Sequence, residues 1–408
     1  MNIYISGITG TGMGPLALMA KAAGYSVCGS DLARGAIYDE LIEAGIEVHI
    51  GEQDGGFLKE KLAEGVDWFC HTSALKNDHS ELVLAREAGI KVTKRDDLTA
   101  FLVEKLGLKM VAVAGTHGKT TTTAMIVFAA LRLGLPVSYI VGTTLGFAPS
   151  GAYQAGAKYF VYEADEYDRN FLKFKPWLAV IPAVSYDHPD IYPSREDYEK
   201  AFLQFEKQSE RVILEGVEAE FELAGAVRRQ DAGLAAAAVL AMAEDYGALV
   251  QLSEVVAILN EFPGVGRRFE RISEGVYSDY AHHPEEIAAT IGVAQDEMRL
   301  RGKKGVVVVY QPHQNTRQHQ VKDLYKEAFL GVDKVFWLPT YLTRENPDLA
   351  VLTPRELAEG LANREIVELA ELGDDLAARL KEYLAAGYLV VLMTAGPADE
   401  WLRGEFGI

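Results

Sequence analysis

The sequence predicts an α/β protein built from three domains, and two observations lead to this fold class. Short apolar runs alternate with longer amphipathic stretches along the chain, which is the pattern of parallel strands covered by helices. The chain has 408 residues, and at roughly 150 residues per domain this length corresponds to two or three domains. The predicted strands cover residues 3–6, 26–29, 68–71, 110–114, 160–163, 178–184, 305–310, 334–338 and 388–393.

Domain boundaries are placed where new strand–turn–helix units begin, because no repeat or Gly/Ser-rich linker marks them. New units begin near residues 107 and 265. We therefore expect domains over residues 1–107, 108–265 and 266–408.

The composition is ordinary for a soluble globular protein, with 49% hydrophobic and 24% charged residues. No run approaches the roughly 18 apolar residues of a membrane span, and no signal peptide is visible, so we expect a cytoplasmic location. Cys28 and Cys70 have no spacing typical of a disulfide framework or metal site. The net charge of −19 argues against binding to nucleic acid or membrane surfaces, because an acidic surface repels phosphate.

A glycine-rich loop follows the first predicted strand, with glycines at positions 7, 10, 12 and 14. Such glycines let backbone N–H groups approach a pyrophosphate at the start of a helix. The dinucleotide fingerprint is incomplete because Pro15 occupies its last position, whereas Asp31 is placed where an acidic residue would hold a ribose. The loop favours nucleotide-phosphate binding. By itself it does not distinguish NAD from another nucleotide diphosphate, and a turn that only packs strand on helix remains an alternative.

A second glycine loop follows the strand 110–114 and reads Gly-Thr-His-Gly-Lys-Thr-Thr-Thr over residues 115–122. Gly-Lys-Thr between a strand and a helix is typical of a P-loop, here in a shorter form because Val113 replaces the first glycine. We expect backbone N–H groups to hold phosphates and Lys119 to reach the β- and γ-phosphates. The Thr120 hydroxyl is expected to bind Mg²⁺.

Two potential metal ligands follow the next predicted strands. Glu163 ends the strand 160–163, and Asp187-His188 comes after the strand 178–184. Because α/β sheets bind ligands at the carboxyl ends of their strands, Glu163 and His188 are candidate Mg²⁺ ligands. A solvated acidic loop and a structural histidine remain the alternative interpretation.

Arginine and histidine are concentrated in the third predicted domain of this acidic chain, at Arg267-Arg268, His282-His283, His313 and Arg317. A tetrahedral zinc site needs more ligands than the histidine pair, and no further spacing supplies them. Recognition of phosphate or carboxylate is therefore the preferred interpretation.

Together these motifs resemble those of the Mur ligases of bacterial cell-wall synthesis, over nearly the whole chain. The matching segments are residues 7–13, 29–31, 115–122, 163–166, 187–188, 267–270, 279–284 and 311–313. The resemblance implies a Rossmann-like UDP-binding domain, a P-loop ATPase-like central domain and a Rossmann-like C-terminal ligase domain.

The resemblance also implies a reaction. ATP phosphorylates the lactyl carboxylate of UDP-N-acetylmuramate to an acyl phosphate, and the amino group of L-alanine attacks it to give an amide. The implied cofactors are ATP and Mg²⁺. The implied partners are these small molecules, without nucleic acid or membrane, and the oligomeric state stays open between a monomer and a weak dimer.

Residue roles are carried over from the resemblance position by position. The UDP-linked substrate would be bound by Gly10, Thr11, Gly12, Met13, Asp31 and Ser73. The adenine nucleotide would be bound by Gly115, Thr116, His117, Gly118, Lys119, Thr120, Thr121, Gln230, Arg268 and Asp279. Mg²⁺ would be held by Thr120, Glu163 and His188, and the incoming amino acid would lie near His282 and Arg317. The implied catalytic set is Lys119, Glu163, His188, Arg268, Asp279 and His282.

Departures from the family pattern keep alternatives open. The bridge over residues 205–229 is short, and Gly233 stands where the family has an Asn near the adenine nucleotide, with Gln230 as a partial substitute. Gln314 replaces an Arg after the Pro-His pair, which changes how the acceptor carboxylate is bound. Transfer of L-alanine is preferred. The alternatives are transfer of L-alanyl-γ-D-glutamyl-meso-diaminopimelate in cell-wall recycling, a nucleotide-binding regulator without catalysis, and a nicotinamide-dependent dehydrogenase.

Overall fold

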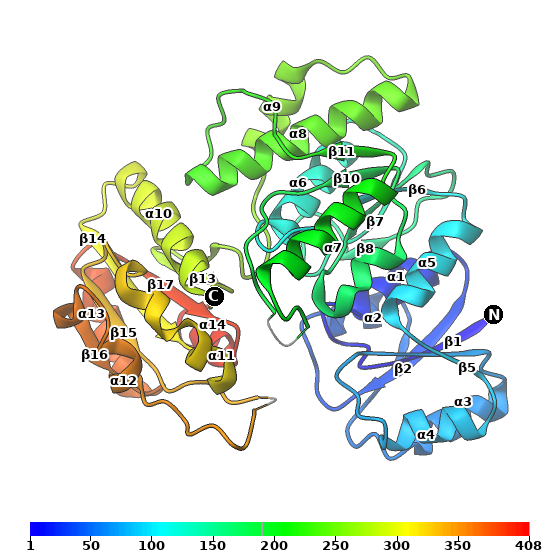
Figure 1. The fold of residues 1–408 in the computed structure, drawn as a ribbon, viewed down its shortest axis with the longest axis horizontal. Coiled ribbons are helices and arrows are strands. Elements are labelled where there is room, and N and C mark those ends of the chain that lie inside the picture. Colours follow the sequence, from blue (N-terminus) through cyan, green and yellow to red (C-terminus); the bar gives the residue numbers. More distant parts are fainter. Residues whose placement is uncertain (189–190, 344, 408) are drawn as a thin grey trace. The chain divides into compact units, whose positions relative to one another are not determined.

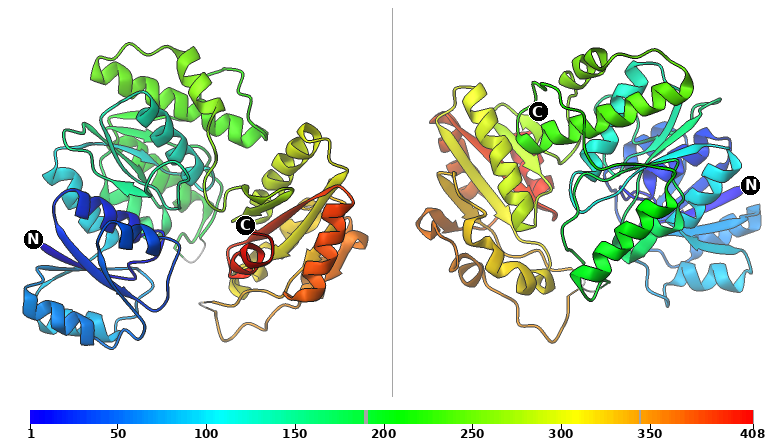
Figure 2. Two further views of the ribbon diagram at one scale, coloured as in Figure 1. Left: turned by 180° about the vertical axis from the view of Figure 1, so that it is seen from behind. Right: turned by 45° about the horizontal axis from the view of Figure 1, so that its top comes forward.

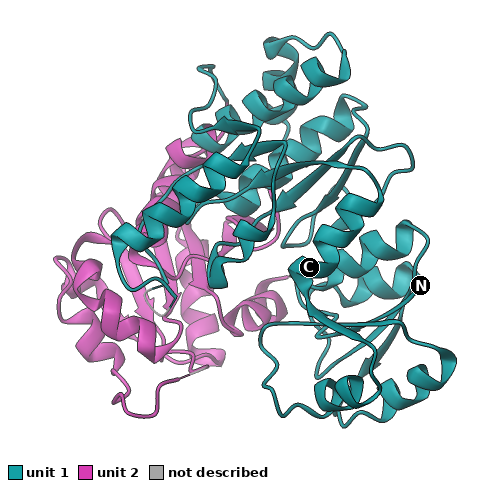
Figure 3. Cartoon of the chain, turned by 45° about the vertical axis from the view of Figure 1, so that its right-hand side comes forward, with its two compact units in different colours: residues 1–221, 230–263 teal, residues 222–229, 264–408 magenta. Residues whose placement is uncertain are grey.

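The computed structural model describes residues 1–188, 191–343 and 345–407. It contains three sheets with helices packed on them (Figures 1 and 2), so the predicted α/β class with three sheet-containing domains is confirmed. The chain forms two compact units, residues 1–221 with 230–263 and residues 222–229 with 264–408 (Figure 3). None of the described helices combines the length and the apolar character that a membrane crossing requires.

The first sheet is parallel, with the strand order β3-β2-β1-β4-β5. Ile3 and Ile5 pack on one face and Tyr4 on the other, as in a parallel sheet covered on both sides. The chain order reverses between β1 and β4, which places the first glycine loop at a switch point where such sheets bind ligands. The elements are β1 (Asn2–Ser6), α1 (Gly14–Ala22), β2 (Ser26–Asp31), α2 (Tyr38–Glu43), β3 (Glu47–Ile50), α3 (Gly56–Glu64), β4 (Trp68–His71), α4 (Ser80–Glu87), β5 (Lys91–Lys94) and α5 (Arg95–Lys105).

The second sheet has the order β11-β10-β6-β9-β7-β8, in which β7 and β8 pair antiparallel. Strand β10 ends at Val180 and does not reach the predicted residue 184, because Pro182 has no N–H to continue the ladder. The elements are β6 (Lys109–Val113), α6 (Lys119–Arg132), β7 (Val137–Ile140), β8 (Gly151–Ala152), β9 (Tyr159–Glu163), η1 (Tyr167–Lys173), β10 (Leu178–Val180), α7 (Arg195–Gln208), β11 (Arg211–Ile213), α8 (Ala226–Tyr246) and α9 (Leu252–Asn260).

The first two sheets share one hydrophobic core. Leu98 and Leu102 of α5 belong to the same buried cluster as Tyr162 of β9. The Tyr162 hydroxyl also donates a hydrogen bond to Asp96 at 2.8 Å. Both glycine loops therefore lie within a single compact unit.

The third sheet has the order β12-β13-β17-β14-β15-β16, with β12 antiparallel to β13. Alternate residues of β14 face opposite sides, since Val306 and Val308 lie in one buried cluster and Val307 and Val309 in another. The elements are β12 (Glu270–Ser273), β13 (Val276–Asp279), α10 (Pro284–Leu300), β14 (Gly305–Gln311), α11 (Asn315–Val321), η2 (Lys322–Glu327), β15 (Lys334–Trp337), α12 (Pro354–Ala358), η3 (Arg364–Ile366), β16 (Val367–Leu369), α13 (Asp374–Ala385), β17 (Tyr388–Thr394) and α14 (Ala398–Phe406).

Candidate active site

The second glycine loop joins β6 to α6 and has room for glycine alone at two positions. Gly118 has a φ of +80°, and a Cβ on it would lie 2.7 Å from a carboxylate oxygen of Asp231. A Cβ on Gly115 would lie 2.8 Å from the carbonyl oxygen of Ala183. Thr116 fixes the loop further, because its N–H donates to the same carbonyl oxygen at 2.8 Å. The sequence motif thus forms a tightly packed loop after a central strand, of the kind whose backbone N–H groups can bind phosphate.

Lys119, the first residue of α6, turns its ammonium group into this loop. Its Nζ donates to the Gly115 carbonyl oxygen at 2.5 Å and to the two carboxylate oxygens of Glu166 at 2.8 and 3.1 Å. Burial alone would lower the pKa of Lys119, but the negative charges of Glu166, Asp165 and Glu163 raise it above its ordinary value. The loop therefore holds a protonated lysine whose partner is an internal carboxylate.

Glu163 ends β9 and presents its carboxylate to the start of α6. The Thr120 hydroxyl donates to Oε1 at 3.0 Å, whereas Oε2 is buried and has no hydrogen-bond partner among the described residues. Burying a carboxylate oxygen without a hydrogen-bond donor costs folding free energy unless a cation binds to it. Carboxylate and hydroxyl oxygens are the ligand types that Mg²⁺ prefers, so these two side chains fit a Mg²⁺ site.

His188 lies beside the Lys119–Glu166 pair. Its Nε2 is 3.8 Å from Glu166 Oε1 and 3.6 Å from Asp187 Oδ2, and the Tyr167 ring packs edge-on against it at 5.1 Å. Sequence reasoning included Glu166 in a motif without giving it a role. Its position three residues after Glu163 was the available signal, but its pairing with a lysine 47 residues away is visible only in the fold.

The other residues of the central domain that are predicted to bind the adenine nucleotide lie around the same loop. Gln230 Nε2 donates to the Pro182 carbonyl oxygen at 3.4 Å, His117 forms a backbone bridge with Ala183, and Thr121 is half-buried in the first turn of α6.

Gly233, which stands where the family pattern has an Asn, makes a close backbone contact. The Val217 N–H donates to the Gly233 carbonyl oxygen at 3.1 Å, and a Cβ on Gly233 would lie 3.0 Å from the Val217 carbonyl oxygen. The segment after β11 therefore packs against α8 at this position, and a side chain there would have to displace it.

Asp31, expected to hold a ribose, fastens the first glycine loop. Its Oδ2 accepts hydrogen bonds from the Thr9 N–H at 3.0 Å and from the Thr9 hydroxyl at 2.7 Å. Its Oδ1 accepts from the Leu32 N–H at 2.8 Å. The carboxylate thus holds the loop to the end of β2.

The other residues predicted to bind the UDP-linked substrate differ in their burial and in their free hydrogen-bonding groups. Gly10 closes a turn, because its N–H donates to the Gly7 carbonyl oxygen at 3.3 Å and its own carbonyl oxygen accepts from Met13 at 3.1 Å. The Met13 side chain is buried in the core, and Ser73 is exposed in the turn after β4. The Thr11 and Gly12 N–H groups, in contrast, donate to none of the described residues.

In the second unit, Asp279 organises the Arg-Arg-Phe-Glu turn. Arg267 and Phe269 have φ values of +56° and +51°, which non-glycine residues adopt only when their surroundings hold them there. Asp279 accepts hydrogen bonds from the Phe269 and Ala281 N–H groups, each at 2.7 Å. Burial raises the pKa of Asp279 above its ordinary value, and the Arg268 charge opposes this shift.

Arg268 is half-buried beside Tyr280. Its guanidinium lies 5.2 Å from the Tyr280 ring centroid, and it forms no side-chain hydrogen bond with the described part of the chain. Arg267, by contrast, donates to the Thr394 carbonyl oxygen at 2.8 Å. The two adjacent arginines therefore differ, and Arg268 is the one free to bind an anion.

His282 and Arg317, which the sequence predicts to lie near the incoming amino acid, are in direct contact. The Arg317 guanidinium contacts His282 Nε2, and His282 Nδ1 lies 3.0 Å from the Tyr280 carbonyl oxygen. A guanidinium only donates hydrogen bonds, so in this contact Nε2 is the accepting atom. His282 Nδ1 also lies 3.4 Å from a carboxylate oxygen of Glu286, so the imidazole is held between a guanidinium and a carboxylate.

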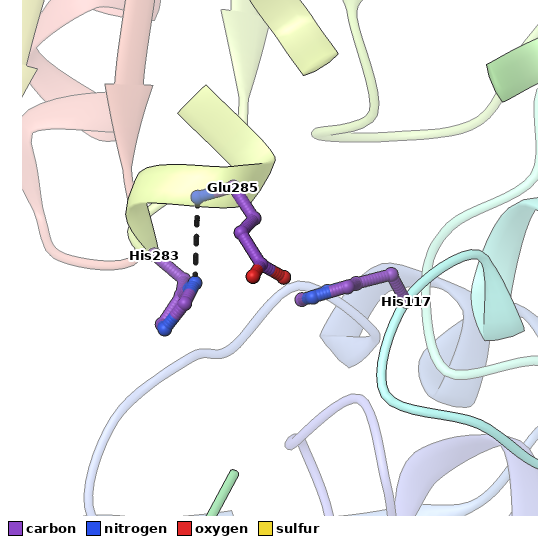
Figure 4. Close-up of side chains that lie close together, drawn as sticks. All are labelled: His117, His283 and Glu285. Carbon is purple, nitrogen blue, oxygen red and sulfur yellow. Dashed lines mark hydrogen bonds between the residues drawn. The ribbon is translucent and has the colours of Figure 1, made fainter. Parts of the chain in front are cut away.

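The neighbouring His283 caps α10. Its Nδ1 accepts a hydrogen bond from the Glu285 N–H at 3.4 Å (Figure 4), and Glu286 completes the capping box. The two histidines of the pair thus have different structural roles.

Three family models match the chain in order. Residues 2–105 match the Mur ligase family, catalytic domain; residues 113–222 match the Mur ligase middle domain; and residues 267–396 match the Mur ligase, glutamate ligase domain. The chain belongs to the Mur ligase family.

Curated relatives carry a more specific name. The chain is 30% identical to a UDP-N-acetylmuramate–L-alanine ligase from Roseiflexus castenholzii, over 100% of this chain and 97% of the relative. It is 32% identical to the ligase of the same name from Laribacter hongkongensis, over 97% and 95%.

Two solved structures share the fold. A UDP-N-acetylmuramate-alanine ligase from Thermotoga maritima has a TM-score of 0.78 at 22% identity, over 99% of this chain and 98% of that one. A murein peptide ligase from Psychrobacter arcticus has a TM-score of 0.64 at 22% identity, over 100% and 99%.

Proposed function

We propose that this protein joins L-alanine to the lactyl carboxylate of UDP-N-acetylmuramate in peptidoglycan precursor synthesis, in the cytoplasm. As a member of the Mur ligase family the chain is an ATP-dependent amide-forming ligase. Relatives that match nearly its whole length are named as alanine-adding enzymes. The structural observation that carries the proposal is the cradle around Lys119, with the unpartnered Glu163 oxygen at its edge.

The central domain would perform the phosphoryl transfer. Lys119 would exchange the Glu166 carboxylate for the β- and γ-phosphates of ATP. Thr120 and Glu163, with His188 as a further ligand, would hold Mg²⁺, which when bound neutralises charge as two anions approach each other. The lactyl carboxylate attacks the γ-phosphorus, and ADP leaves from an acyl phosphate. Arg268, whose guanidinium is available, would add positive charge to this step.

The third domain would bind the acceptor. Arg317 would hold the carboxylate of the amino acid, since a guanidinium binds carboxylates through two parallel hydrogen bonds. The free amine attacks the acyl carbon, and the tetrahedral intermediate collapses to an amide and phosphate. His282, which contacts the Arg317 guanidinium, would orient this region.

Phosphate release from ATP tests the proposed function. Release is expected only when UDP-N-acetylmuramate and L-alanine are both present, and Lys119→Ala should abolish it. Lys105→Ala, at an exposed lysine on α5, is the control and should release phosphate at the wild-type rate. Release with the tripeptide L-alanyl-γ-D-glutamyl-meso-diaminopimelate in place of L-alanine would favour the recycling ligase. No release with any acceptor would reject both ligase functions.

A further inference from the structure

Three polar side chains lie completely buried close to His282 and Arg317, and the proposed reaction uses none of them. Tyr310 lies on β14, Gln318 on α11 and Tyr325 in η2, and each is 0% exposed. A buried polar group without a hydrogen-bond partner costs folding free energy. The partners of these three groups therefore show what they hold in place.

The three side chains form one chain of hydrogen bonds. The Tyr310 and Tyr325 hydroxyl oxygens are 2.6 Å apart, and the Tyr325 hydroxyl donates to Gln318 Oε1 at 2.7 Å. Each end of the chain reaches a backbone carbonyl oxygen. Gln318 Nε2 donates to that of His313 at 3.0 Å, and the Tyr310 hydroxyl lies 3.2 Å from that of His282.

The two ends of this buried chain belong to separate parts of the third sheet. His282 follows β13, whereas His313 and Arg317 follow β14, and β17 lies between these two strands. The His282 and His313 rings meet edge-on with their centroids 5.8 Å apart. Because the buried chain holds one backbone carbonyl group on each side, it sets the separation between the His282 segment and α11, which carries Arg317.

The hydroxyl protons couple the links of the buried chain to one another. Burial raises the pKa of Tyr310 and the pKa of Tyr325 above their ordinary values, so each hydroxyl keeps its one proton at neutral pH. Two oxygen atoms 2.6 Å apart need a proton between them, and two protons therefore serve three oxygen–oxygen contacts. A change at one link reorients the hydroxyl at the next link, which makes the chain a single unit.

We propose that Tyr310, Tyr325 and Gln318 are positioning residues that hold His282 and Arg317 at the separation that the acceptor amino acid requires. The assignment rests on the proposed function, which supplies that acceptor. Arg317 binds a carboxylate through two bonds only if its planar guanidinium faces the ligand. A displacement of about 1 Å in a reacting site can reduce the rate by about 100-fold. Buried hydrogen bonds to the supporting backbone prevent such a displacement.

Steady-state kinetics with Tyr310→Phe tests the assignment, because this substitution removes only the hydroxyl group. The KM for L-alanine is expected to rise by about 3- to 10-fold, the range for losing one neutral hydrogen bond. The KM values for ATP and UDP-N-acetylmuramate should stay constant. An unchanged KM for L-alanine would overturn the proposal, and so would an equal rise in all three KM values, because that result indicates a general structural defect.

Tyr277→Phe is the matched control. The Tyr277 hydroxyl, on β13 of the same sheet, belongs to a buried residue and donates to Glu297 at 2.8 Å. This variant should lose stability in urea unfolding as Tyr310→Phe does, but it should keep the wild-type KM for L-alanine. A rise equal to that of Tyr310→Phe would overturn a specific role for the buried chain. If Tyr310→Phe fails to fold, Tyr325→Phe is judged by the same criteria.

A double variant with both Tyr310→Phe and Tyr325→Phe tests whether the buried chain acts as one unit. Its KM for L-alanine should rise by less than the product of the two single effects, because either substitution already breaks the chain. Effects that multiply would show two independent contacts and would overturn the single chain.

Imidazole NMR resonances give a readout that does not depend on turnover. The ring signals of His282, identified by their absence in His282→Gln, should shift in Tyr310→Phe and stay in place in Tyr277→Phe. Unchanged signals in Tyr310→Phe would overturn the positioning role. A wild type that releases no phosphate with any acceptor would reject the proposed reaction, and the ring signals would still decide whether the buried chain positions His282.

Discussion

The Lys119 ammonium lies 2.8 Å from Glu166 Oε2, in the part of the glycine loop where a P-loop lysine meets phosphate. The Glu166 side chain is 1% exposed and that of Lys119 15% exposed. In the proposed reaction, nucleotide binding would have to break this buried ion pair before the lysine reaches phosphate. The proposed function predicts that this pair stabilises the ligand-free loop and competes with phosphate.

Glu166→Gln is expected to destabilise the ligand-free protein and to increase the stabilisation by Mg²⁺ and ADP. Removing one partner of a buried pair costs about 3 kcal/mol, whereas phosphate then meets a lysine without a competing carboxylate. Thermal unfolding with and without ligand measures both effects. Glu196→Gln, which breaks the exposed pair with Lys200, should change neither the stability of the ligand-free protein nor its stabilisation by ligand. An identical ligand-induced shift in the wild type and Glu166→Gln would contradict the competition.

Glu163→Gln is expected to raise the Mg²⁺ concentration needed for half-maximal phosphate release by about 10-fold or more. The amide removes the charge from the oxygen that lacks a hydrogen-bond partner, so the cation loses its strongest ligand. A Mg²⁺ titration at saturating ATP is the measurement. Glu104→Gln, at an exposed position on α5, is the control. An unchanged Mg²⁺ requirement would remove Glu163 from the metal site.

Arg317→Lys is expected to raise the KM for the acceptor amino acid by about 10-fold or more while the KM for ATP stays constant. Lysine keeps the charge but loses the planar fork that contacts His282 and would bind a carboxylate. Steady-state kinetics with each substrate varied in turn separates the two constants. Arg355→Lys, at an exposed arginine of α12, should leave both unchanged. A rise in the KM for ATP instead would place Arg317 on the nucleotide.

Asp245 is expected to make stability depend on pH. Burial works against its ionisation, but hydrogen bonds from Lys109, Lys158 and Tyr159 lower the pKa of Asp245 well below its ordinary value. Its contribution is therefore present above the unfolded-state pKa of about 3.9 and is lost as the pH falls towards the lower folded-state value.

Asp245→Asn should lower the free energy of unfolding, measured by urea titration at pH 7, by about 1–2 kcal/mol once the partial exposure of both lysines is considered. The difference from the wild type should shrink when the pH falls below about 3.9. Glu261→Gln, which removes an exposed pair with Arg132, should show no such dependence. A constant difference across this pH range would show that the charge of Asp245 contributes nothing.

Among the residues that the structure describes, the predicted strands are all interior strands of the three sheets, and none of the six edge strands was predicted. Interior strands such as β14 (Gly305–Gln311) are buried on both faces and read as continuous apolar runs. Edge strands such as β5 (Lys91–Lys94) and β16 (Val367–Leu369) are short and alternate with polar residues. Of the interior strands, β7 and β13 were also missed.

The sequence alone determined the α/β class, the glycine loops and the family resemblance, because these depend on residue types at short spacing. Only the tertiary structure decided which side chains meet across long separations. It placed Glu166 on Lys119, left one oxygen of Glu163 without a partner, and brought the Tyr310 hydroxyl to the His282 carbonyl oxygen. The physical reason is that parallel strands gather their carboxyl ends at one edge of a sheet, whatever their distance along the chain.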